Sequence, residues 1–294
     1  LSPFLARKGA RGMVGPIRRD SAPCYTSVAT LDTDPGTRKS MWPPGQSVLA
    51  SGLPKLHPAA TKHTMLLAID TSTRYAGVAL LDDSRLLVQL LHWRSRQNHS
   101  VELLPSIETV LNRQQLTIQD ITAIAVTTGP GNFSALRVGL STAKGLAWAN
   151  DIPLVAATTL ETEAFSYRSS TAPICAAMEA GRGQIAWALF EDFEDRDAAL
   201  HQTSVEATTT PEDMLRILPS PILICGEALE QHRDALSSDA PSGIRLALPY
   251  LPGQRVAALA HIGHARLESG QRQDPTTLEP LYLRRPTITE PRRR

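Results

Sequence analysis

The sequence predicts an α/β protein made of two subdomains, each a mixed sheet flanked by helices. Three apolar runs with tight connections fill residues 65–94, and helical and strand patterns then alternate as far as residue 168. A similar but less regular alternation follows from residue 173. A strand meander followed by helix–strand pairs needs both antiparallel and parallel neighbours in one sheet. We expect an N-terminal subdomain over 65–160 and a C-terminal subdomain over 161–294.

The elements of the first half follow from their spacing. The run MLLAID predicts a buried strand, and two more strands are predicted around the turn residues Asp82-Asp83-Ser84. Apolar residues at helical spacing then predict a helix that starts near His99. The remaining predictions are a strand at 121–129, a helix at 133–150, a strand at 152–159 and a helix from 160.

The second half carries weaker signals of the same kind. Strands are predicted at 173–180 and 184–192, a short helix opens on Pro211, and a strand lies within 221–229. A last helix is marked by one apolar stripe, formed by Val256, Leu259, Ala260, Gly263 and Leu267. The basic, proline-containing end of the chain is expected to fray.

Composition narrows the class of protein. Of the 294 residues 42% are hydrophobic and 20% charged, and no apolar run approaches the roughly 18–20 residues that span a bilayer. The three cysteines are far apart and form no CxxC pair, so neither a disulfide framework nor a zinc site is indicated. We expect a cytoplasmic protein without membrane contact.

The charge is unevenly distributed. Residues 1–64 hold 9 basic and 3 acidic residues, whereas the remainder holds 21 basic and 26 acidic ones. The mildly acidic remainder argues against unaided binding of nucleic acid. Residues 1–64 lack helical or strand periodicity, and we expect them to be disordered or non-native; a transit segment is the other interpretation.

Two segments could hold an anion. Asp70, Thr71 and Ser72 follow the first strand, where a carboxylate and hydroxyls could hold a metal-bound phosphate or merely cap a turn. Gly129 and Gly131 flank Pro130 before a helix, where glycines let a backbone approach a phosphate closely. The loop is neither a P-loop nor a dinucleotide fingerprint. A third candidate, Glu179 with Arg182, is as readily a solvated hairpin.

The helix after this loop carries a ridge of small residues. Ala135, Gly139, Ala143 and Ala147 recur every four residues, so another helix could approach closely. That helix could belong to this chain or to another protein, and the spacing leaves both open.

Taken together, the motifs resemble the TsaB (YeaZ) family. The resemblance rests on LLAIDTSTRYAGVALL, NHSVELLPSIETVL, ITAIAVTTGPGNFSALRVGLSTAKGLAWANDIPLVAATTLE and EPLYLRRP, in that order, and covers Met65 to about Pro286. It implies the actin-like ATPase fold and a place in the synthesis of threonylcarbamoyladenosine beside the anticodon of tRNA. It also implies two partners, TsaD and the ATPase TsaE.

The family's catalytic paralogue, TsaD, holds its metal through an HxxxH motif. In this chain Thr159 and Glu163 stand where those histidines would lie, and they cannot replace two imidazoles. The resemblance therefore implies a non-catalytic scaffold that activates TsaD and has no cofactor of its own. ATP and metal would be used by partner subunits, tRNA would be met only through the complex, and a homodimer would form when the chain is alone.

The resemblance also assigns site residues. Asp70, Thr71, Ser72, Gly129 and Gly131 are expected to be at most a remnant of a nucleotide site. The expected surface for TsaD is formed by His99, Leu103, Leu104, Ile107, Leu111, Phe133, Ala135, Leu136, Gly139, Ala143 and Ala147. A metal-dependent glycoprotease-like peptidase and a small-molecule kinase of the same fold remain as alternatives.

Overall fold

The computed structural model describes residues 65–96, 98–191, 201–238 and 241–282. The chain divides into two units, Leu1–Leu56 and His57–Arg294, and every described residue belongs to the second. The prediction for residues 1–64 lies outside the described part.

The first sheet has the strand order β3-β2-β1-β4-β5. Its strands are β1 (Met65–Asp70), β2 (Tyr75–Asp82), β3 (Leu87–Arg94), β4 (Ile121–Thr127) and β5 (Leu154–Ala157). The strands β1, β2 and β3 pair antiparallel, whereas β1, β4 and β5 pair parallel. The predicted mixed sheet is confirmed, and β1 lies at its centre.

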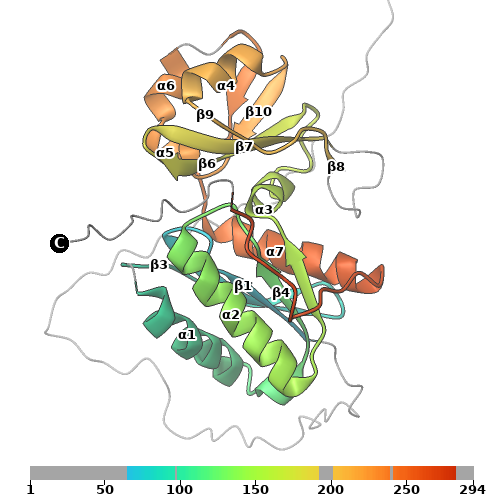
Figure 1. Ribbon diagram of the computed structural model, residues 1–294. Helices are drawn as coiled ribbons and strands as arrows, with labels where there is room; N and C mark the ends of the chain where they lie inside the picture. Colours follow the sequence, from blue (N-terminus) through green and yellow to red (C-terminus); the bar gives the residue numbers. More distant parts are fainter. Residues whose placement is uncertain (1–64, 97, 192–200, 239–240, 283–294) are drawn as a thin grey trace, which may run out of the picture. The chain divides into compact units, whose positions relative to one another are not determined.

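Helices cover both faces of this sheet. On one face α1 (His99–Arg113) and α2 (Phe133–Asn150) lie side by side, with the one-turn helix η1 (Ile118–Asp120) between them in sequence (Figure 1). The other face carries α7 (Gly253–Glu268), which packs on β1, β2, β4 and β5. Alternation along β1 explains both contacts, since Leu67 and Ile69 join the cluster with α1 and α2 while Leu66 and Ala68 join the cluster with α7.

The helix α2 has clear start and stop signals. The side chain of Asn132 accepts hydrogen bonds from the backbone N–H groups of Ser134 and Ala135, 3.1 Å each, which caps the N-terminus. Asp151 ends the helix in the left-handed conformation, with φ of 53°. The predicted span 133–150 is therefore confirmed.

The second sheet has the order β11-β10-β6-β7-β8, and β9 also pairs with β7. The strands are β6 (Ile174–Gly181), β7 (Gln184–Glu191), β8 (His201–Gln202), β9 (Ala207–Thr209), β10 (Ile222–Cys225) and β11 (Ile244–Leu246). The helices are α4 (Pro211–Ile217), α5 (Ala228–Gln231) and α6 (Arg233–Ser238). Parallel pairs at β10 and antiparallel pairs at β7 make this sheet mixed as well, so the predicted α/β class is confirmed.

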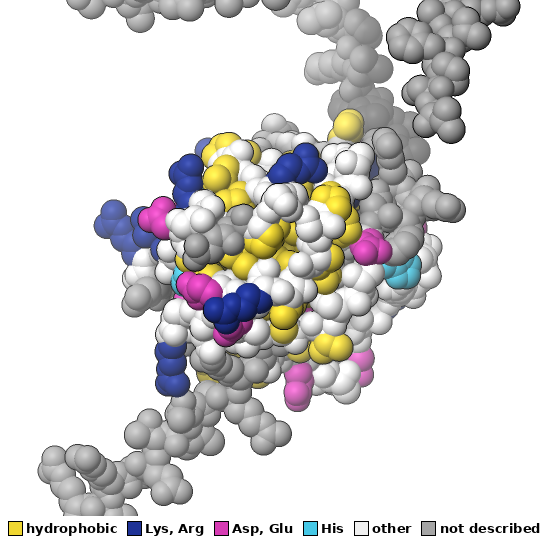
Figure 2. Space-filling model, turned by 90° about the horizontal axis from the view of Figure 1, so that it is seen from above, with side chains coloured by type: hydrophobic (Ala, Val, Ile, Leu, Met, Phe, Trp, Pro, Cys, Tyr) yellow, Lys and Arg dark blue, Asp and Glu magenta, His cyan; other side chains and the backbone are white. Residues whose placement is uncertain are grey.

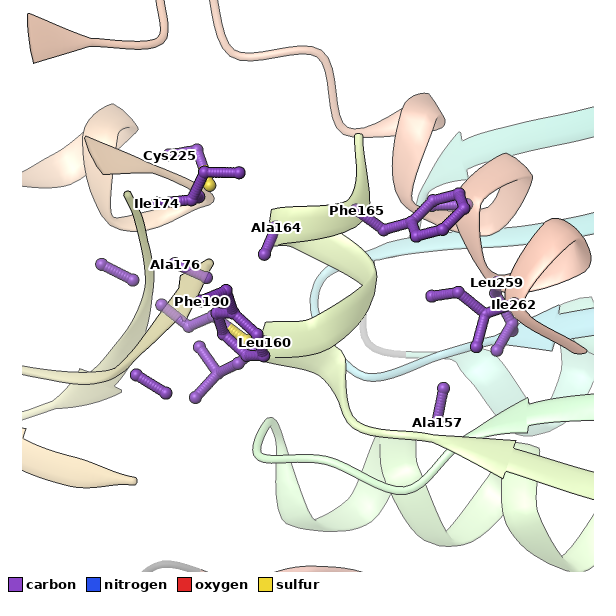
Figure 3. Packing of buried hydrophobic residues seen from close by; sticks show 14 of the residues in the cluster. Ala157, Leu160, Ala164, Phe165, Ile174, Ala176, Phe190, Cys225, Leu259 and Ile262 are labelled. Carbon is purple, nitrogen blue, oxygen red and sulfur yellow. The ribbon is translucent and has the colours of Figure 1, made fainter. Parts of the chain in front are cut away.

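The short helix α3 (Thr159–Phe165) joins the cores of the two sheets. Figure 3 shows Leu160 and Ala164 directed toward Ile174 and Phe190 of the second sheet, while Phe165 lies beside α7. All these residues belong to one buried cluster. The two sheets therefore share a hydrophobic core.

One helix lies in an unexpected place. By sequence α7 follows the second sheet, yet it packs on the first sheet and on α3. The division near residue 160 stays a prediction. Among the described residues, no helix is both long and apolar enough to cross a bilayer.

Candidate functional site

Asp70 lies at the end of β1, in the interior of the described part of the chain, and is only 1% exposed. Its Oδ1 accepts hydrogen bonds from the backbone N–H of Ser72 at 3.0 Å, the Ser72 hydroxyl at 2.7 Å and the Thr127 hydroxyl at 2.8 Å. Its Oδ2 accepts one from Nε of Arg255 at 2.5 Å. Both carboxylate oxygens are thus occupied by protein groups.

Arg255, in the first turn of α7, is the cation of this cluster and is itself only 1% exposed. A guanidinium has five N–H donors. The other acceptors are Glu163 Oε1 (2.9 Å), the Tyr250 hydroxyl (3.1 Å), the Thr73 hydroxyl (2.9 Å) and the Tyr75 carbonyl (2.8 Å). Each donor therefore has an oxygen partner. We call the side chains of Arg255, Asp70, Glu163, Tyr250 and Thr73, with the Tyr75 carbonyl, the Arg255 cluster.

The electrostatics of the Arg255 cluster set its two carboxyl groups apart. Burial raises the pKa of Asp70, but the attraction of Arg255 and the bonds from Ser72 outweigh burial and hold the pKa below its ordinary value. For Glu163 burial dominates over Arg255 and over the hydrogen bond from Tyr250, so its pKa lies above its ordinary value. Asp70 is therefore the firm anion of the cluster, and Glu163 takes up a proton more readily.

The oxygens of Asp70 are held by groups of the chain itself. A divalent cation binds through free oxygen atoms, and all oxygens of this carboxylate already accept hydrogen bonds. The neighbouring hydroxyls are also committed, because Thr71 donates to the carbonyl of Ala135 at 2.6 Å and Ser72 donates to Asp70. The chain's own contacts thus explain these three residues, and a remnant of a nucleotide site there stays a prediction.

The glycines of the Gly129–Gly131 turn are explained by the chain's own backbone. A Cβ on Gly131 would lie 2.1 Å from the carbonyl oxygen of Ser72, and one on Gly129 would lie 2.7 Å from that of Leu281. Gly129 also has φ of +112°, which other residues rarely adopt. These close approaches need glycine without any ligand. Whether Gly131 also meets a nucleotide stays a prediction.

A cavity of about 380 Å³ lies beside the turn, between residues of the two sheets. Its walls include Glu179, Glu227 and Arg74. The guanidinium of Arg74 pairs with Glu227 and Glu230, each at 3.0 Å, and so links the β1–β2 turn to α5. Burial raises the pKa of Glu227 despite the nearby Arg255 and Arg74. The walls therefore carry acidic and basic side chains together, and a nucleotide in this cavity stays a prediction.

Glu179, the third sequence candidate, accepts a hydrogen bond from the backbone N–H of Gly181 at 2.8 Å and pairs with His232 at 2.7 Å. Arg182 stands exposed in the turn with φ of 59°. Their arrangement is that of a hairpin at the rim of the cavity.

The predicted partner surface needs a correction. Ala135, Gly139, Ala143 and Ala147 are buried in this molecule, facing the first sheet and α1. A Cβ on Gly139 would lie 2.3 Å from the Thr71 hydroxyl, so the close neighbour is the chain itself. Also buried are His99, Leu103, Ile107, Leu111 and Leu136. Helical spacing of small residues indicates a close neighbour but not which chain supplies it.

Two predicted interface residues do reach the surface. Leu104 is 54% exposed, and Phe133 is partly exposed, with its ring 4.8 Å from that of Tyr282. His99, by contrast, places Nε2 3.0 Å from the carbonyl of Thr73 and so helps to fix the start of α1.

The opposite side of α2 is open. Ser134, Ser141, Gly145 and Trp148 are all exposed and recur at spacings of seven, four and three, which places them on one stripe. Trp148 is 82% exposed, and nothing lies within 4 Å of a Cβ built on Gly145. We call this stripe, with Val101 and Leu104 of the neighbouring α1, the outer α1–α2 face.

A groove marks the start of the outer α1–α2 face. It has a volume of about 470 Å³ and is lined by residues of both helices, among them Ser100, Ser134 and Val138. Figure 2 looks down on the molecule from above the view of Figure 1, and on that side it shows hydrophobic side chains among polar atoms and basic side chains separated from one another. The visible described residues of that side form no continuous basic patch.

Sequence reasoning missed Arg255 as a site residue. The signal was present, because Arg255 lies four residues before Leu259 and seven before Ile262, on the buried side of α7. Thr159 and Glu163 lie one turn apart on α3 and both are buried, whereas the sequence predicted a helix only from residue 160. The Thr159 hydroxyl has no hydrogen-bond partner among the residues that the structure describes, whereas Glu163 is held by Arg255 and Tyr250.

Comparison with known proteins identifies relatives of this chain. A protein-family model described as "TsaD: tRNA N6-adenosine threonylcarbamoyltransferase" matches residues 94–264. The TsaB protein of Bacillus subtilis (strain 168), named for tRNA threonylcarbamoyladenosine biosynthesis, is 29% identical over 222 residues, which are 74% of this chain and 93% of that protein. The Escherichia coli (strain K12) TsaB protein is 32% identical over 150 residues, 50% of this chain and 63% of that protein.

A solved structure shows the same fold. YeaZ from Pseudomonas aeruginosa has a TM-score of 0.62 at 24% identity, covering 75% of this chain and all of that one. The two mixed sheets with their flanking helices are thus those of the actin-like fold that the sequence predicts. The family model covers more than half of the chain, and the match to the Bacillus protein runs through nearly its whole length. The chain belongs to the family described by the TsaD model, and within it to the TsaB (YeaZ) proteins.

Proposed function

We propose that this chain works in the biosynthesis of tRNA threonylcarbamoyladenosine as a non-catalytic subunit that binds and activates a TsaD protein. The observation that carries the proposal is the state of Thr159 and Glu163. These residues stand where the paralogue's metal-binding histidines would lie, and Glu163 is bound to Arg255 at 2.9 Å. A hydroxyl and an occupied carboxylate cannot hold a catalytic transition metal.

The outer α1–α2 face is the surface we propose for TsaD. The small side chains of Ser134, Ser141 and Gly145 let a helix of another protein approach closely. Val101, Leu104 and Trp148 are 68%, 54% and 82% exposed and supply apolar area around that stripe. Large exposed apolar side chains on two adjacent helices are typical of protein-binding surfaces. This face replaces the buried ridge that the sequence suggested.

The remaining partners follow from the same proposal. TsaE joins the pair, ATP and metal are used by the partner subunits, and tRNA is bound only by the assembled complex. When TsaD is absent, the outer α1–α2 face pairs two copies of this chain. The peptidase and kinase alternatives gain no support, because the oxygens of Asp70 are occupied and the described residues contain no group of three or more His, Cys, Asp or Glu side chains placed to hold a metal.

The experiment is size-exclusion chromatography and a binding titration with TsaD of the same organism. Leu104→Asp should weaken the complex by at least about tenfold, or ~1.4 kcal/mol, because it places a charge in the apolar interface. Ile217→Asp is the matched control, since Ile217 is 62% exposed but lies on α4 of the second sheet. The same TsaD affinity for the wild type and for Leu104→Asp would refute the proposed surface, and no complex with wild type would refute the function.

A further inference from the structure

The oxygens around Arg255 resemble the ligand set of a metal ion. They come from β1, from the turn after it, from α3 and from the loop before α7, and they converge on one buried group. Two belong to carboxylates, two to hydroxyls and one to a backbone carbonyl. Oxygen ligands of these types, with one or two carboxylates, are those that Mg²⁺ and Ca²⁺ prefer.

We propose that the guanidinium of Arg255 takes the place of a divalent cation in this fold, and that its removal uncovers a site that binds Mg²⁺ or Ca²⁺. The guanidinium is anchored to the chain and bonds to oxygens from all four segments. It therefore holds the end of β1 against α3 and α7 without any bound ligand. This goes beyond the proposed function, which uses the contact between Glu163 and Arg255 only to argue that α3 holds no catalytic metal.

The charges of the Arg255 cluster support the proposal that the guanidinium stands where a divalent cation would fit. Asp70 and Glu163 bring two carboxyl groups to a cluster in which Arg255 supplies one positive charge. A divalent ion would balance both carboxylates, whereas the guanidinium balances one.

A second arginine on the same helix provides a matched comparison. Arg266 pairs with Glu161 at 2.6 Å and also bonds to the carbonyl of Ala156, and its side chain is 22% exposed. It has one carboxylate partner, so its removal leaves no pair of carboxylates. Arg255 and Arg266 therefore differ in the feature that the proposal depends on.

The experiment compares thermal unfolding of the wild type, Arg255→Ala and Arg266→Ala with and without millimolar MgCl₂ or CaCl₂, at matched ionic strength. Arg255→Ala should unfold at a lower temperature, and divalent cations should raise its midpoint by roughly 5 °C in a saturable way. Wild type and Arg266→Ala should not respond. The double variant Arg255→Ala, Asp70→Asn should lose the response, because one carboxylate ligand is gone.

If Arg255→Ala folds by itself, two outcomes would overturn the proposal. One is an Arg255→Ala variant that ignores both cations, and the other is an equal shift in the wild type or in Arg266→Ala. If Arg255→Ala does not fold by itself, it is refolded from urea with and without each cation. Recovery that depends on the cation supports the proposal, and no recovery with either cation refutes it. TsaD is absent from these measurements, so failure here and failure of the proposed function are separate results.

Discussion

The inner and outer sides of α2 each carry a glycine, and the surroundings of the two glycines differ. Gly139 lies against the end of β1, where an added Cβ would be 2.3 Å from the hydroxyl of Thr71, whereas an added Cβ on Gly145 meets nothing within 4 Å. They are six residues apart and identical in chemistry. The difference teaches that a small side chain on a helix does not by itself show whether anything packs against it. The neighbouring element has to be known first. The inner side is filled by the chain's own turn, and the outer side is open for another protein.

The largest loss of stability is expected in the Arg255 cluster, in the interior beyond the inner side of α2. Asp70→Ala leaves the guanidinium of Arg255 buried without its main anion, and breaking a buried pair by removing one partner costs about 3–5 kcal/mol. Urea unfolding followed by circular dichroism measures this loss. A loss below about 1 kcal/mol would mean that the Arg255 cluster contributes little to stability.

Gly139→Leu should follow in size. The new side chain would overlap Thr71 and disturb the hydrogen bond from Thr71 to the carbonyl of Ala135, so we expect a loss of about 3 kcal/mol. The measurement is again the free energy of unfolding, with Gly145→Leu as the control that should stay within about 0.5 kcal/mol of wild type. Equal stability of the two variants would contradict the distinction between the two sides.

Gly145→Leu sharpens the comparison from the outer side. Its fold should be intact, but a bulky residue on the open stripe should hold the TsaD helix away and weaken the complex about tenfold, or ~1.4 kcal/mol. Isothermal titration calorimetry with TsaD gives the affinity. Undiminished binding by this variant would move the partner surface away from the stripe of Ser134, Ser141 and Gly145.

The smallest effect is the pH dependence of stability that comes from the Arg255 cluster, because the pKa shifts of its two carboxyl groups have opposite directions. The pKa of Asp70 is lowered, so its contribution is present above its ordinary value of 3.8 and is lost as the pH falls through its folded value. The pKa of Glu163 is raised, so its contribution is present below its ordinary value of 4.5 and is lost as the pH rises through its folded value. Glu163→Gln should therefore show a flatter stability profile above pH 4.5 than wild type does.

Urea unfolding of the wild type and of Glu163→Gln at a series of pH values gives this comparison. The difference between the two profiles removes the titration of the other carboxyl groups that they share. Parallel profiles above pH 4.5 would show that burial does not raise the pKa of Glu163.

Much of the fold could be predicted from local signals. Apolar runs ended by turn residues marked the strands, and the cap residue Asn132 with the left-handed Asp151 bounds α2 at the predicted residues. Each of these features depends on neighbours within a few residues, which is why sequence reasoning reaches them.

The parts that could not be predicted depend on distant pairings. Asp70 and Arg255 are 185 positions apart, and no local pattern shows that α7 returns to the first sheet. Which side of α2 faces the sheet was equally hidden, because both sides carry small residues. Ala143 with Gly139 and Ser141 with Gly145 look alike until the neighbouring strand is known.

The return of α7 has a consequence for how the chain is made. All five strands of the first sheet leave the ribosome long before Gly253–Glu268 does. The hydrophobic face that α7 covers therefore stays exposed to solvent in the nascent chain. A fragment that stops after β11 would share this bare side and should aggregate, even though every strand of both sheets is present.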